Sequence, residues 1–154
     1  MRMMFVSIGL GLCLNLAGMA VPVSGSETMQ KHDYVAGQVW TYSTRPIDLK
    51  STLTVLKVDE FPKVGKIIHI RIDDVNLKNS GAPGGVSHQV GHIPIAENAL
   101  SKSTIKLLKS DAPIKDTDLE GYKIWRSAFD QGKAGAYSIS VADAVDTIEV
   151  VLNK

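Results

Sequence analysis

Residues 66–73 of the sequence are KIIHIRID, a stretch in which isoleucine alternates with histidine and arginine. Because successive side chains of a β-strand point to opposite faces, the stretch is predicted to be a strand with one apolar and one mixed face. The apolar face carries Ile68, Ile70 and Ile72, and the mixed face carries Ile67, His69 and Arg71. A strand that needs cover on one face is typical of an antiparallel sheet with helices on one side.

Two further strands are predicted before this stretch. Residues 38–42 alternate polar and apolar side chains that favour β-structure, and residues 51–59 are rich in Thr, Val and Leu. The connection at 60–65 is too short for a crossover helix, so the strands around it are expected to be antiparallel. Residues 86–95 contain a glycine and a proline that disfavour a helix, and this segment is expected to be extended. The sequence therefore predicts a β-meander of three to four strands.

Helices are predicted mainly in the C-terminal half of the chain. Residues 96–109 mix leucine and isoleucine with lysine and serine, and residues 117–131 place large apolar side chains three and four positions apart. Residues 140–143, Ser-Val-Ala-Asp, match a capping box and predict the start of a third helix. A strand over residues 148–152 is the alternative at this end, and residues 137–139 are predicted as a last short strand.

Strands that come first and helices that follow indicate an α+β domain with a small antiparallel sheet. Two to three helices, mostly C-terminal, are expected to pack on one face of that sheet, with the other face in water. Residues 37–154 are predicted to form this single domain.

The N-terminus has the pattern of a signal peptide. Arg2 precedes an apolar run over residues 5–20, which is shorter than the roughly 20 residues of a membrane-spanning helix. Residues 1–25 are therefore expected to be removed by cleavage near residue 20 or 25, and an uncleaved anchor is the alternative. Residues 26–36 form a polar leader, and the single cysteine, Cys13, leaves with the signal peptide. The expected location is the periplasm or the medium of a bacterium.

The charges exclude some partners from the expected list. Seventeen Lys and Arg stand against sixteen Asp and Glu, which gives a formal charge of +1, so nucleic acid is not an expected partner. The sequence has no phosphate-binding or dinucleotide glycine motif and no Gly-x-Ser-x-Gly, so no cofactor is predicted. No membrane span is expected once the signal peptide is removed.

Four histidines, at positions 32, 69, 88 and 92, raise the question of a metal site. His88 and His92 would share one face of a helix, but their segment is expected to be extended, where a rise of about 3.3 Å per residue separates them by roughly 13 Å. Bonds from imidazole to zinc are only about 2.1 Å long. No metal site is predicted, and a turn that brings His69, His88 and His92 together is the alternative. His92 is otherwise expected to be a hydrogen-bonded structural residue beside Pro94.

A partner-binding surface is predicted from aromatic and cationic side chains on or near the mixed face. Such residues are enriched at the energetic centres of protein interfaces. The candidates are Trp40, Tyr42, Arg45, His69 and Arg71. The alternative is that both aromatic residues belong to the core and that His69 and Arg71 form a solvated face.

A small, nearly neutral, exported domain without a catalytic motif is expected to work by docking to another protein. The predicted function is therefore a protein-binding, inhibitory or envelope accessory module without catalysis of its own, with an envelope or secreted protein as its partner. The alternative is a small hydrolase or metal-binding protein that uses His69, His88 and His92.

Overall fold

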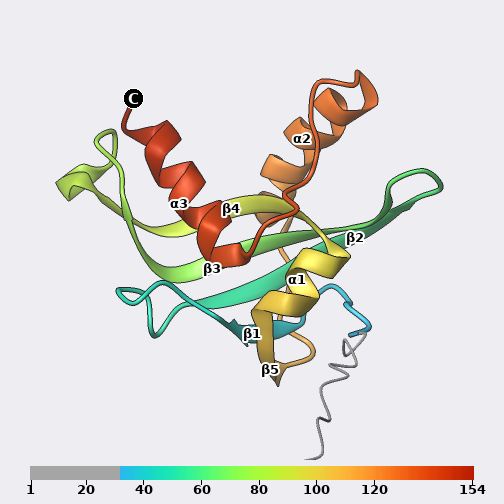
Figure 1. The fold of residues 1–154 in the computed structure, drawn as a ribbon, viewed down its shortest axis with the longest axis horizontal. Coiled ribbons are helices and arrows are strands. Elements are labelled where there is room, and N and C mark those ends of the chain that lie inside the picture. The colour runs from blue at the N-terminus through green and yellow to red at the C-terminus, as the bar shows by residue number, and fades with distance from the viewer. Residues whose placement is uncertain (1–31) are drawn as a thin grey trace, which may run out of the picture.

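Residues 32–154, which the computed structural model describes, form a five-stranded antiparallel sheet and three α-helices (Figure 1). The predicted signal peptide lies outside the described residues. The strands are β1 (Val39–Tyr42), β2 (Thr52–Phe61), β3 (Gly65–Lys78), β4 (Val86–Ala96) and β5 (Thr104–Lys109). The helices are α1 (Glu97–Ser103), α2 (Glu120–Asp130) and α3 (Val141–Leu152), with 3₁₀ turns η1 (Pro83–Gly85) and η2 (Asp116–Leu119). No helix in this part of the chain is long and apolar enough to cross a membrane.

The sheet has the order β4-β3-β2-β1-β5, so its first four strands form a meander as predicted. The turn between β2 and β3 closes at Gly65, whose φ of +83° is a conformation that glycine adopts without steric cost. The α+β class and the mostly C-terminal helices are confirmed.

The apolar core lies between the sheet and the helices α1 and α3. The side chains of Ile68, Ile70 and Ile72 on β3 are fully buried there, on the face that the alternation predicted. We call this side of the sheet the core face. Helix α3 begins at the predicted capping box, because Ser140 Oγ accepts a hydrogen bond from the backbone N–H of Asp143 at 3.1 Å.

Helix α2 lies against the opposite face of the sheet, where no helix was predicted. The ring of Trp125 on α2 lies 4.5 Å from the ring of His69 on β3, centroid to centroid. Since His69 points away from the core face, α2 covers the side that carries Ile67, His69 and Arg71, which we call the α2 face. Only α1 and α3 therefore pack on the expected face.

The helix predicted over residues 96–109 is wrong in its second half. Helix α1 ends at Ser103, and residues 104–109 form the edge strand β5, in which Leu107 pairs with Trp40 and Lys109 with Val39 of β1. The β-branched Thr104 and Ile105 interrupt the helix, and the free edge of β1 offers ladder hydrogen bonds in its place. The short strand predicted at 137–139 is a single bridge between Tyr137 and Ile95.

Candidate functional site

The predicted binding residues are divided between the two faces of the sheet. Trp40 and Tyr42 belong to the core and are 6% and 4% exposed. Each has a polar partner inside the molecule, since Trp40 Nε1 donates to Gln38 Oε1 at 3.1 Å and Tyr42 Oη lies 2.8 Å from Ser51 Oγ. Both aromatic residues therefore follow the core alternative, and neither lies on the α2 face with His69.

The α2 face holds a pair of histidines in direct contact. Nδ1 of His69 lies 3.0 Å from Nε2 of His92, and the two rings are nearly parallel at 13°. His69 is completely buried, which is contrary to the solvated role that the alternative gave it, and His92 is half-buried. The structure thus joins β3 and β4 through two imidazoles.

A bulge in β4 turns His92 toward His69. Between the pairs Ile72–Val90 and Ile70–Ile93, two residues of β4 stand opposite one residue of β3. The additional residue reverses the alternation of side chains along β4, so Val90 belongs to the core face while His92, two positions further along, points to the α2 face. His88 takes no part in the contact between His69 and His92, so the three histidines do not converge.

His88 has its own surroundings outside the histidine pair. Its Nδ1 lies 3.1 Å from the carbonyl oxygen of Val75. Among residues 32–154, no group of three or more His, Cys, Asp or Glu side chains is arranged to hold a metal ion.

Aromatic side chains of α2 cover the histidine pair. The Tyr122 and Trp125 rings lie 4.8 Å and 4.5 Å from the His69 ring, both edge to face. The helix can approach this closely because Gly121 has no side chain. A Cβ at Gly121 would lie 2.5 Å from Cβ of His92.

Asp59 of β2 closes the cluster from the other side. Tyr122 donates a hydrogen bond to its Oδ2 at 2.9 Å, and His69 Nε2 lies 3.5 Å from the same oxygen. We call Asp59, His69, His92, Tyr122 and Trp125 the histidine cluster. Nε2 of His69 is a buried nitrogen without a hydrogen-bond partner among the residues described.

These contacts favour one tautomer of the pair. A hydrogen bond between two neutral imidazoles needs one N–H and one bare nitrogen. If His92 Nε2 donates to His69 Nδ1, His69 carries its hydrogen on Nε2 and presents it to Asp59. The reverse arrangement would place a nitrogen lone pair against the carboxylate, so the first is preferred.

Burial keeps both rings neutral at pH 7. It lowers the pKa of His92 from 6.5 to about 4. Burial and the like charge of His92 also lower the pKa of His69, and the attraction of Asp59 opposes this shift only in part. The cluster can take up protons in acid, but no Ser, Cys or Thr side chain is hydrogen-bonded to either ring in the described chain.

Arg71, the second predicted residue of this face, is held by two acids. Its Nε lies 3.0 Å from Asp73 Oδ2, and its Nη1 lies 2.8 Å from Asp118 Oδ1 in η2. The guanidinium ties η2 to the sheet, so much of its hydrogen-bonding capacity is used inside the molecule.

Arg45, the remaining predicted residue, is a buried cation at the start of the loop between β1 and β2. Its Nε donates to Asp48 at 2.6 Å, and its Nη1 donates to Asp146 and Glu149 of α3 at 3.0 Å and 3.2 Å. Burial alone would lower the pKa of Arg45, but these hydrogen bonds raise it above its ordinary value. Arg45 is therefore charged and joins the loop to α3.

The same network fixes the backbone of this loop. Asp48 Oδ1 accepts a hydrogen bond from the backbone N–H of Asn76 at 2.7 Å, and Asn76 Nδ2 donates to the carbonyl of Ile47 at 2.9 Å. Arg45 Nη2 donates to the carbonyl of Asn76 at 3.0 Å. We call residues 45–50 the braced loop, because buried charged groups hold it at both the side-chain and the backbone level.

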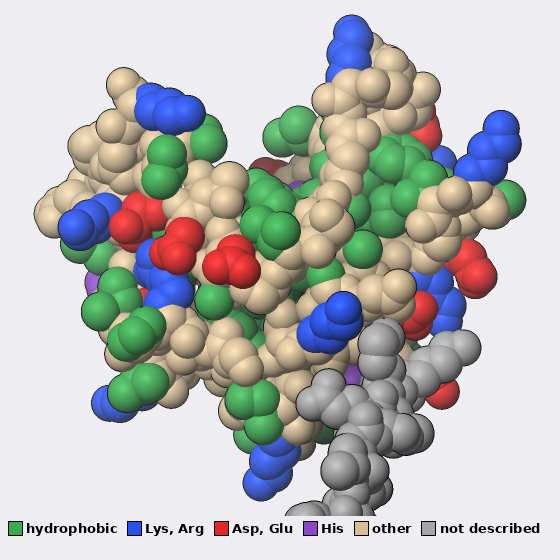
Figure 2. All heavy atoms as spheres, in the orientation of Figure 1, with side chains coloured by type: hydrophobic (Ala, Val, Ile, Leu, Met, Phe, Trp, Pro, Cys, Tyr) green, Lys and Arg blue, Asp and Glu red, His purple; other side chains and the backbone are tan. Residues whose placement is uncertain are grey.

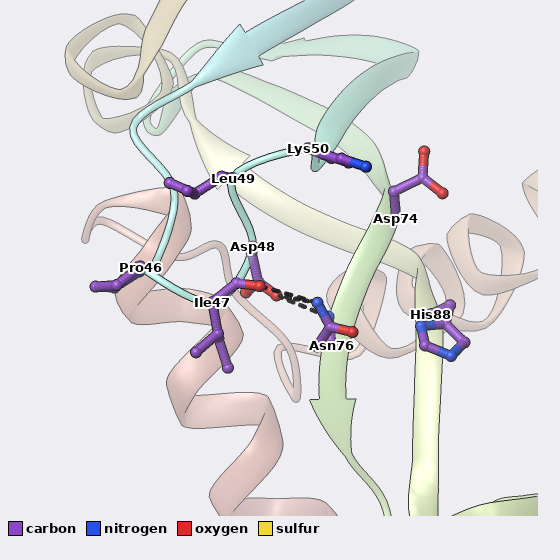
Figure 3. A pocket seen from close by; sticks show the side chains of 8 residues that line it. All are labelled: Pro46, Ile47, Asp48, Leu49, Lys50, Asp74, Asn76 and His88. Carbon is purple, nitrogen blue, oxygen red and sulfur yellow. Dashed lines mark hydrogen bonds between the residues drawn. The ribbon is translucent and has the colours of Figure 1, made fainter.

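The braced loop exposes apolar side chains beside a pocket. Ile47 and Leu49 are 60% and 81% exposed, while Asp48 between them is 1% exposed. Figure 3 shows Asp48 turned inward to Asn76, with Leu49 and Pro46 on the other side of the loop. The pocket has a volume of about 480 Å³ and is lined by Pro46, Ile47, Asp48, Leu49, Lys50, Asp74, Asn76 and His88.

Sequence reasoning named Arg45 but not the two aliphatic residues near it. The alternation Pro-Ile-Asp-Leu-Lys resembles the end of a strand, and exposure cannot be seen in the sequence. Pro46, followed two positions later by Asp48, was the available signal for a turn.

Charges of both signs are interspersed on the face of the molecule that Figure 2 shows, in keeping with the small net charge. Comparison with protein-family models, with curated proteins and with solved structures finds no match for this chain. The geometry of the braced loop and of the histidine cluster is therefore the basis for inferring function.

Proposed function

We propose that the protein is an exported, non-catalytic module that binds another envelope or secreted protein through the braced loop. The observation that carries this proposal is the exposure of Ile47 and Leu49 on a loop that buried ionic contacts hold in place. Two exposed aliphatic side chains close together on a surface loop offer apolar area that would leave water when a partner covers them.

The brace supports binding because it reduces the entropy lost on association. Ordering a flexible loop in a complex costs about 1–2 kcal/mol per residue in backbone freedom. The contacts of Arg45, Asp48 and Asn76 already meet that cost in the free protein. A partner with an apolar socket would then gain the burial of Ile47 and Leu49 with little further ordering.

The experiment uses the full chain, expressed with its own N-terminus in a bacterial host that contains the partner. Crosslinked companions and the mature N-terminus are identified by mass spectrometry, and the affinity of the purified companion is then measured. Leu49→Asp should weaken binding at least about tenfold, because a buried leucine contributes about 1.5–3 kcal/mol.

Val64→Asp is the matched control. Val64 is 60% exposed, as is Ile47, but it lies in the turn between β2 and β3, away from the braced loop. The control should bind the companion with unchanged affinity. Equal binding by Leu49→Asp and by the native chain would contradict the proposal, as would processed protein that emerges without a companion.

The alternative of a hydrolase or metal protein based on three histidines has less support. His69 and His92 meet on the α2 face, whereas His88 lines the pocket beside the braced loop. The proposal therefore assigns partner binding to the loop and leaves the histidine pair for separate consideration.

A further inference from the structure

Helix α2 is attached to the sheet by side chains other than those of the apolar core. Within residues 32–154, the core cluster draws on the sheet, α1 and α3 and contains no residue of α2. The attachment of α2 includes Tyr122 and Trp125 against His69, Gly121 against His92, the hydrogen bond from Tyr122 to Asp59, and Phe61 of β2 against Trp125 and Phe129. Loss of these contacts would release α2 without opening the core.

Protonation of the two histidines acts directly on this attachment. An imidazolium ion has two N–H donors and no acceptor, so two such ions cannot share the hydrogen bond between His69 and His92. Their facing nitrogens, now 3.0 Å apart, would both carry positive charge in a site from which water is largely excluded. Separation of β4 and α2 from His69, or entry of water, would relieve the repulsion.

We propose that the histidine cluster is an acid-sensitive lock on α2, which opens when both His69 and His92 are protonated, while the sheet, α1 and α3 remain folded. The lock does not depend on the partner-binding role of the braced loop. The cover over His69 is aromatic and carries no formal negative charge, so it attracts a protonated ring only weakly and cannot neutralise a second positive charge beside it.

The other charged groups near the pair do not neutralise the two positive charges of a doubly protonated pair. Asp59 faces His69 from β2 and can offset one positive charge, but it already accepts from Tyr122 and lies 3.6 Å from Arg126 of α2. Lys57 of β2 adds a further positive charge on the same side. Along β3, the charge of Arg71 is matched by Asp73 and by Asp118 of η2.

The lock acts in the acid range. The two lowered pKa values, about 4 for His92, mean that the ring pair stays neutral at pH 7 and takes up its protons well below pH 6. Opening would uncover Ile67 and Phe61 together with the aromatic side of α2.

Two tryptophans allow the lock and the core to be followed separately by NMR of the ¹⁵N-labelled protein. Trp125 Nε1 donates to the carbonyl of Gly135 next to α2, and Trp40 Nε1 donates to Gln38 in the core. On titration from pH 7 to pH 3.5, the indole resonance of Trp125 should move to its solvent-exposed position first. The Trp40 resonance should keep its folded position at that pH.

His92→Gln tests the role of the second charge, because glutamine can still hydrogen-bond to His69 but cannot be protonated. This variant should shift the midpoint for Trp125 to lower pH by about one unit or more, since a single charge can be offset by Asp59. His88→Gln, outside the histidine cluster, is the control and should leave the midpoint unchanged.

Hydrogen exchange of the native chain gives a second measurement that needs no variant. At pH 4, amides of α2 should lose protection while those of β3 and α3 keep it, after correction for the intrinsic pH dependence of exchange. Simultaneous loss of protection in α2 and the core would overturn the proposal. An unchanged midpoint in His92→Gln would overturn it as well.

Discussion

Gly121 is the residue at which α2 comes closest to the sheet, and it provides a test of the packing on the α2 face. Gly121→Ala would add about 1 kcal/mol of helix propensity. The new Cβ would lie 2.5 Å from Cβ of His92, and overpacking of this kind costs about 1–3 kcal/mol. We expect a net loss of up to about 2 kcal/mol in the free energy of unfolding, measured with urea.

Gly135→Ala is the matched control for this change. A Cβ at Gly135 would meet nothing within 4 Å, and its φ is not positive, so the free energy of unfolding should change little. A stabilised Gly121→Ala protein would show that α2 does not pack against His92 as closely as the geometry indicates.

Residue chemistry shows where sequence reasoning was sufficient and where it was not. The alternation in residues 66–73 correctly separated the buried isoleucines from His69. The same reasoning placed His92 by the regular rise of a strand and could not place the bulge that turns it to His69. A bulge depends on pairing with a neighbouring strand, and such pairing leaves little trace in one stretch of sequence.

The side chain of Arg45 joins the loop between β1 and β2 to α3 and to Asn76 of β3. The association of these elements is therefore sensitive to the loss of Arg45. Arg45→Met would leave Asp48 buried without its counter-ion, a situation that typically costs about 3–5 kcal/mol. We expect the free energy of unfolding to fall by that amount, as measured by urea denaturation followed by far-UV circular dichroism.

Arg126→Met provides the comparison, because the side chain of Arg126 is 40% exposed and solvent screens its ion pairs with Asp130 and Asp59. Exposed pairs contribute about 0–1 kcal/mol. Equal effects of the two substitutions would mean that the brace of the loop does not stabilise the protein.

Among the elements, β5 shows most clearly why secondary structure could be predicted only in part. Residues 104–109, Thr-Ile-Lys-Leu-Leu-Lys, have an ambiguous pattern, and the open edge of β1 decided for a strand. The cap of α3, by contrast, depends on residues 140–143 alone and was predicted correctly. Local chemistry could be derived from the sequence, whereas the choice of partner strand could not.

For the molecule as a whole, the histidine pair predicts a pH-dependent stability. In the folded state the pKa of each ring lies below 6.5, so the unfolded chain binds more protons once the pH falls below about 6.5. The free energy of unfolding should therefore decrease as the pH falls from 7 toward 4. The slope contributed by two histidines is at most about 2.7 kcal/mol per pH unit.

Urea unfolding at pH 7, 6 and 5 would measure this slope, with His92→Gln as the variant and His88→Gln as its control. The variant should reduce the dependence on pH by about half, because one of the two shifted groups is removed. The control should keep the native slope. Stability that rises between pH 7 and pH 5 would contradict the sign derived from the burial of the rings.

The bulge that turns His92 toward His69 also separates two zones of the molecule for variation. The pocket beside the braced loop includes His88 of β4, and the histidine cluster includes His92 of the same strand, but the two sites have no residue in common. Substitutions at Leu49 and at His92 affect two sites that share no residue and should act additively. The binding partner and the response to acid could therefore be changed independently in the same small protein.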